Sequence, residues 1–102
     1  MKVSNITSIR IEGRGKNRDI YGNPYSAWKA VIDVKMNHHN VRMVLYEPMT
    51  WGDSYESRVL RNAIEGINET LNINLKENDK RINYTYKHVS RDADLEKPQN
   101  WK

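Results

Sequence analysis

The sequence predicts a two-layer α+β domain, in which one helix packs on one face of an antiparallel β-sheet in the chain order β-β-β-α-β. Apolar residues alternate with other residues in four stretches, a period of two that is typical of half-buried strands. Between the third and the fourth stretch, apolar residues recur at spacings of three and four, which is typical of an amphipathic helix.

The stretch from Tyr21 to Met36 is the centre of the expected sheet. Its first residues, Tyr21-Gly22-Asn23-Pro24-Tyr25, favour a turn, because Gly and Asn tolerate positive φ and Pro disfavours helix at the preceding residue. In the strand that follows, one face carries Trp28, Ala30, Ile32, Val34 and Met36, and the other carries Tyr25, Ala27, Lys29, Val31, Asp33 and Lys35. We therefore expect a central strand with its Trp28 face in the core.

Three further strands are expected, at residues 3–13, 41–46 and 82–88. In the first of them, Ile9 and Ile11 share a face. Short polar loops join the first three strands, which favours an antiparallel meander.

The helix is expected to begin at Asp53, where the carboxylate can accept hydrogen bonds from free backbone N–H groups and Glu56 completes a capping-box-like pair. Its apolar stripe runs from Tyr55 to Leu71. Gly66 interrupts the pattern, at a cost of roughly 1 kcal/mol against Ala in a helix interior, or marks an early end.

The length of 102 residues suits one small domain. We expect a single α+β domain over residues 1–89, followed by a polar, loosely ordered C-terminal tail over residues 90–102.

Composition narrows the function classes. The absence of cysteine excludes disulfides and thiolate chemistry, and neither a signal peptide nor a membrane-spanning apolar run is present, so we expect a cytoplasmic protein with no membrane partner. The net charge of +4 permits attraction to nucleic acid or to an acidic protein, but the basic residues are scattered.

No pattern of residues indicates catalysis, a metal or a cofactor. His38 and His39 are adjacent, so their side chains point apart on a strand and favour a solvated turn. Carboxylate catalysis needs two positioned acids, and the helix cap already explains the best candidate pair, Asp53 and Glu56. We therefore expect a protein that is not an enzyme and holds no cofactor or metal.

Several short motifs recur in a familiar order: Ile9-Arg10-Ile11-Glu12-Gly13-Arg14, Tyr21-Gly22-Asn23-Pro24-Tyr25, Pro48-Met49-Thr50-Trp51-Gly52 with Tyr55, Ile82-Asn83-Tyr84-Thr85-Tyr86 and Val89-Ser90-Arg91-Asp92-Ala93-Asp94-Leu95. This order resembles a set of small, mostly uncharacterised bacteriophage accessory proteins, which share a Gly-Asn-x-Tyr turn and a Tyr/Trp-Gly start of the helix. The resemblance implies a phage accessory protein that acts inside the host cell, and it supplies no catalytic residues.

A first candidate surface combines the charged loop from Arg14 to Tyr21 with the start of the helix. Arg, Tyr and Trp dominate the residues that contribute most to protein–protein affinity. The predicted protein-binding residues are Arg14, Lys16, Arg18, Tyr21, Trp51 and Tyr55. Together with the resemblance, they predict a non-enzymatic protein that binds and modulates, most simply inhibits, a host macromolecular machine such as a defence nuclease or a polymerase. For Trp51, the alternative is that it only packs the helix start onto the core.

The alternative function is nucleic-acid binding on the sheet face that the helix leaves open. Cations with an aromatic ring on an open sheet suit a phosphate backbone and stacked bases, although a solvated sheet face also favours Lys and Arg. By alternation this face carries Arg10, Tyr25, Lys29, Lys35, Arg42 and Lys87. A third hypothesis is a homodimer formed by pairing of an edge strand.

Overall fold

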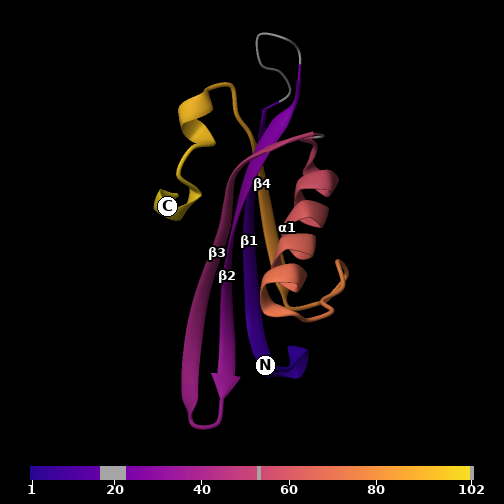
Figure 1. Ribbon diagram of the computed structural model, residues 1–102, viewed down its shortest axis with the longest axis vertical. Helices are drawn as coiled ribbons and strands as arrows, with labels where there is room; N and C mark the ends of the chain where they lie inside the picture. Colours follow the sequence, from indigo (N-terminus) through magenta and orange to yellow (C-terminus); the bar gives the residue numbers. More distant parts are fainter. Residues whose placement is uncertain (17–22, 53, 102) are drawn as a thin grey trace.

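The computed structural model describes residues 1–16, 23–52 and 54–101. Its elements follow the predicted order β-β-β-α-β, which confirms the α+β class (Figure 1). In chain order they are the 3-10 helix η1 (Val3–Asn5), β1 (Ile6–Lys16), β2 (Tyr25–Met36), β3 (His39–Trp51), α1 (Glu56–Leu71), β4 (Ile82–His88), η2 (Asp92–Asp94) and η3 (Pro98–Asn100).

The four strands form one sheet in the order β3-β2-β1-β4. β2 pairs antiparallel with both β1 and β3, which confirms the expected meander. β4, however, pairs parallel with β1, so the sheet is mixed and the prediction of an antiparallel sheet is wrong for this strand. The reason is the helix: β3 runs in the direction of β1, α1 returns the chain to the other end of the sheet, and β4 then starts where β1 starts.

The core lies between the sheet and α1. Trp28, Ala30, Ile32 and Val34 of β2 are all buried there, as the alternation predicts. The buried helix residues that meet them are Val59, Ala63, Ile64 and Ile67. Met36, predicted on the same face, is 45% exposed, because the hairpin of β2 and β3 extends beyond the end of α1 (Figure 1).

The helix differs from the prediction at its first turn. It begins at Glu56, and its N-cap residue is Tyr55, which makes no side-chain capping bond. Asp53, the expected cap, lies outside the described residues. The helix continues through Gly66 to Leu71 and ends at Asn72, whose φ of 54° is left-handed. None of the helices in the described ranges has both the length and the apolar character needed to cross a bilayer.

Gly66 lies inside the helix because the Trp28 ring packs against it. A Cβ at residue 66 would be 3.0 Å from Trp28 Cη2 and closer still to Cζ2. The glycine therefore lets a large ring fit between β2 and α1, and the early helix end that the sequence left open does not occur.

The C-terminal segment also differs from the prediction. Leu95 is fully buried and Trp101 is 8% exposed, so residues 92–101 are not loosely held in this structure. They pack on the sheet face opposite α1, where Val89, Leu95 and Trp101 form a second apolar cluster with Tyr25 and Ala27 (Figure 1). This contact explains why Tyr25 and Ala27 are buried although they lie on the face away from the helix.

Candidate functional site

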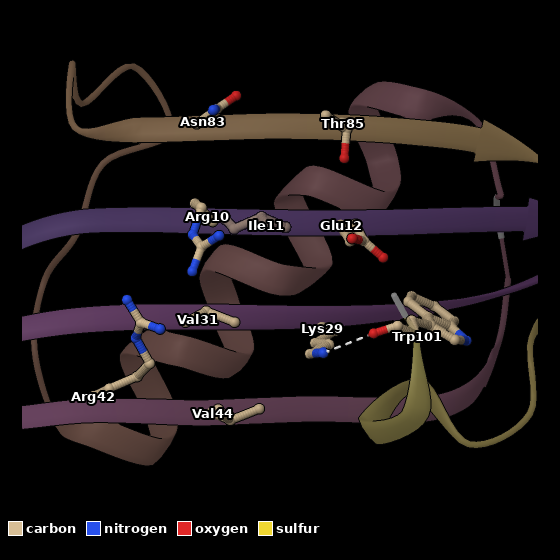
Figure 2. A pocket seen from close by; sticks show the side chains of 10 residues that line it. All are labelled: Arg10, Ile11, Glu12, Lys29, Val31, Arg42, Val44, Asn83, Thr85 and Trp101. Atoms are coloured by element: carbon tan, nitrogen blue, oxygen red, sulfur yellow. Dashed lines mark hydrogen bonds between the residues drawn. The ribbon is translucent and has the colours of Figure 1, made fainter.

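The tail and the open sheet face enclose a groove of about 460 Å³ (Figure 2). All four strands and the tail contribute to its lining, which consists of Arg10, Ile11, Glu12, Lys29, Val31, Arg42, Val44, Asn83, Thr85 and Trp101. Arg10 and Arg42 lie toward one end of the groove in this view, whereas Trp101 closes the other end. The groove therefore has a basic end and an aromatic end.

The pleat of the strands positions these side chains. Ile9 and Ile11 point into the core, so Arg10 and Glu12, which follow them in the sequence, point to the open face. The register places Val31 opposite Arg10 and Lys29 opposite Glu12. Each of these two cations therefore lies beside a side chain of the neighbouring strand that is not a cation.

Two of the three groove cations are already paired. Arg42 Nε lies 2.8 Å from Asp33 Oδ1, and this guanidinium, together with the Ser8 hydroxyl, holds the pKa of Asp33 below its ordinary value. Lys29 Nζ donates to the Trp101 carbonyl at 3.1 Å (Figure 2). Arg10 makes no hydrogen bond or salt bridge to any described residue, although its charge also lowers the pKa of Asp33.

A cluster of charged and aromatic side chains attaches the tail to the sheet. The Arg14 guanidinium lies 4.2 Å from the centre of the Trp101 ring and donates to the Asp94 carbonyl at 3.0 Å. Lys16 Nζ lies 2.6 Å from Asp92 Oδ1, which also accepts a hydrogen bond from the Tyr25 hydroxyl. We call these six residues (Arg14, Lys16, Tyr25, Asp92, Asp94 and Trp101) the tail clamp.

The clamp shifts the pKa of its ionisable groups. Hydrogen bonds from Lys16 and then from Tyr25 lower the pKa of Asp92, and the Asp92 carboxylate raises the pKa of Lys16. Burial, and then the bond to Asp92, raises the pKa of Tyr25. The charged carboxylate and ammonium groups are thus the forms that hold the tail in place.

The predicted nucleic-acid residues are only partly brought together. Arg10, Lys29 and Arg42 line the groove, whereas Lys87 lines a smaller neighbouring pocket. Lys35 is exposed near the tip of the β2–β3 hairpin, where its partner in the register is Asn40. Tyr25 is 2% exposed beneath the tail, so its predicted role as a stacking platform for bases is wrong in this structure.

The predicted protein-binding residues divide into two sets. Trp51 at the end of β3 is 62% exposed and Tyr55 at the start of α1 is 53% exposed. Arg14 and Lys16 instead contact the tail. Arg18 and Tyr21 lie outside the described residues.

Trp51 does not fill the core. Its ring contacts the Tyr25 ring with centroids 5.0 Å apart, on the face of the sheet where the tail packs. The interpretation in which Trp51 only packs the helix start onto the core therefore does not fit its exposure.

Sequence reasoning missed the tail side of the groove. Trp101 carries no periodic signal, because it follows a stretch without regular helix or strand. Asn83 and Thr85 could have been included, since they alternate with Tyr84 on the same face as Lys87.

Within residues 1–16, 23–52 and 54–101, no group of His, Asp or Glu side chains converges as ligands for a metal ion. His38 and His39 are exposed at the β2–β3 turn.

No protein-family model matches the chain, and neither a curated protein nor a solved structure matches it significantly.

Proposed function

We propose that this chain is a non-enzymatic bacteriophage accessory protein, which binds a host macromolecular machine such as a defence nuclease or a polymerase and inhibits it. The observation that carries the proposal is the exposure of two large aromatic side chains, Trp51 at 62% and Tyr55 at 53%. The phage context and the host-cell location come from the resemblance of the sequence motifs.

Exposed aromatic rings of this kind favour a protein partner. A Trp or Tyr side chain buries a large apolar area at low conformational cost, and such residues dominate the affinity of protein–protein contacts. Met49 of β3, close to Trp51 in sequence, is 38% exposed and can extend the apolar surface. A few such anchors suffice for a small protein to occupy the ligand site of a larger machine.

The test is an affinity pull-down from host lysate, with and without nuclease treatment, using wild type and the double variant Trp51→Ala, Tyr55→Ala. The proposal expects discrete host proteins that survive the nuclease and are lost with the double variant. Met36→Ala is the matched control, because Met36 is another exposed apolar side chain (45%) but lies at the hairpin tip. Equal recovery of the host proteins by wild type and double variant would refute the assignment of this surface.

A second candidate function is nucleic-acid binding in the groove, favoured by its three cations Arg10, Lys29 and Arg42. It predicts binding of single-stranded DNA or RNA that weakens steeply with salt and with Arg10→Glu. Lys80→Glu, an equal charge change at an exposed loop residue, is the control. Binding that is absent, or that ignores both salt and Arg10→Glu, would exclude the groove as a nucleic-acid site.

A further inference from the structure

The two outer strands of the sheet differ in length. β3 and β4 form the edges, and β3 has 13 residues whereas β4 has seven. Within the described residues no strand pairs with the outer edge of β3. An edge of this length presents a row of backbone N–H and C=O groups to any strand that can pair with them.

β3 is also the most apolar part of the exposed surface. Of the eight large apolar side chains that are exposed among the described residues, five belong to this strand. They are Val41 (39%), Val44 (46%), Tyr46 (46%), Met49 (38%) and Trp51 (62%). Isolated exposed apolar residues are ordinary, but their concentration on one open edge is typical of an interaction surface.

The middle of β3 lacks the usual protection of an edge strand. Natural edges carry lysines, prolines or inward-pointing charges that prevent pairing. The four residues from Met43 to Tyr46 contain no charge and no proline, since Pro48 and Glu47 come after them. Arg42 on the other side forms a salt bridge with Asp33 of β2.

We propose that β3 pairs antiparallel with β3 of a second copy of this chain, with the two-fold axis at Val44. A two-fold axis makes the contact self-complementary, so each residue meets a partner at the same distance from Val44 in the other copy. In this register Val44 faces Val44, and Met43 faces Leu45 of the second copy.

The side chains of β3 are compatible with this register. Arg42 of each copy lies opposite Tyr46 of the other copy. In both of these pairs the guanidinium can lie against the aromatic ring. Glu47 then faces Val41, so no two like charges are opposed between residues 41 and 47. An axis at Arg42 would instead oppose two guanidinium groups, which is unfavourable.

The dimer would present the proposed protein-binding aromatics at its two ends. Trp51 lies seven residues beyond Val44 on β3. At a rise of about 3.3 Å per residue, the two Trp51 side chains would be about 45 Å apart. Two such ends can engage a symmetric or repeated target with an affinity above that of either end alone.

The first measurement is sedimentation equilibrium of wild type, Val44→Lys and Val44→Glu over a wide range of concentrations. The proposal expects a wild-type dimer, and in each variant a dissociation constant raised by about tenfold or more, because like charges would face each other at the axis. Thr85→Lys is the control, because it adds a charge to an exposed residue of the same sheet face on the other edge strand. Val44 is exposed, so both variants should keep the fold, and circular dichroism checks this.

The second measurement mixes the two variants in equal amounts. Lys opposite Glu at the axis should restore a heterodimer, which native mass spectrometry separates from either variant alone. A monomeric wild type at every concentration, or variants that dimerise as well as wild type, would overturn the proposal. These outcomes are independent of the pull-down, since Trp51 and Tyr55 are unchanged in both variants.

Discussion

The two faces of the sheet are covered in different ways. On one face, a helix of 16 residues contributes buried side chains at regular spacing, from Val59 to Ile67. On the other face, a segment with only two short 3-10 helices contributes a few anchors, chiefly Leu95 and Trp101. Both coverings bury residues of β2, but only the first does so through a repeated pattern.

The two faces of the sheet are stabilised by different kinds of interaction. The helix face is held mainly by apolar contacts, which do not depend directly on the protonation of any side chain. The tail face adds charge-dependent contacts to a smaller apolar cluster, because Arg14 lies against Trp101 and Lys16 binds Asp92. We therefore expect the tail to detach locally under conditions that leave the helix and the sheet folded.

The largest expected effect comes from the helix face. Ile67→Ala removes a fully buried side chain and should lower the free energy of unfolding by about 2–5 kcal/mol. Leu95→Ala removes an equally buried side chain from the tail and should cost less, because detachment of the tail limits the loss. Urea unfolding of both variants measures the difference. An equal loss of stability would show that tail and sheet unfold as one unit.

Gly66 offers a sharper test of the helix face. In an exposed helix, Gly→Ala would stabilise by about 1 kcal/mol. Here the added methyl group meets the Trp28 ring, so Gly66→Ala should destabilise the protein by about 1–3 kcal/mol. Thermal unfolding gives the sign directly. A variant that is more stable than wild type would show that Trp28 can move without cost.

The fold could be predicted from the sequence wherever a pattern repeats. Alternation along β2 identified Trp28, Ala30, Ile32 and Val34 as core, and the helical period identified α1. The parallel pairing of β4 could not be obtained this way, because alternation gives the same pattern for either strand direction. Leu95 and Trp101 of the tail belong to no periodic pattern of apolar residues, so the sequence did not indicate that they are buried.

In the candidate site too, the sequence predicted what a repeated pattern determines and not what a single contact determines. Alternation placed Arg10, Lys29 and Arg42 on one face, and they line one groove in the structure. Alternation also placed Tyr25 on that face, which is correct. It could not predict that the tail covers the Tyr25 side chain. Whether any of these residues binds a partner stays a prediction.

A smaller effect is expected from the cation–π contact of the tail clamp. Arg14→Met should free the Trp101 ring at a cost of about 1 kcal/mol or less, while the helix face stays intact. Hydrogen exchange should then speed up at the Leu95 and Trp101 amides but not at those of α1. The matched control is Arg58→Met, a comparable change on α1 away from the tail. Faster exchange throughout the sheet would contradict local release.

The smallest effect is expected on acidification. The folded-state pKa of Asp92 lies below its ordinary value of 3.8, so its stabilising contribution is fully present above that value. The contribution is lost as the pH falls through the lower folded-state pKa, where Asp92 becomes neutral and gives up its salt bridge to Lys16. NMR signals of residues 92–101 should therefore shift in that window before those of α1. Asp92→Asn should abolish this early step and loosen the tail slightly at neutral pH, because the other contacts of the tail remain. If the signals of α1 and the tail instead moved together in both proteins, the charges of the tail clamp would not be what holds the tail to the sheet.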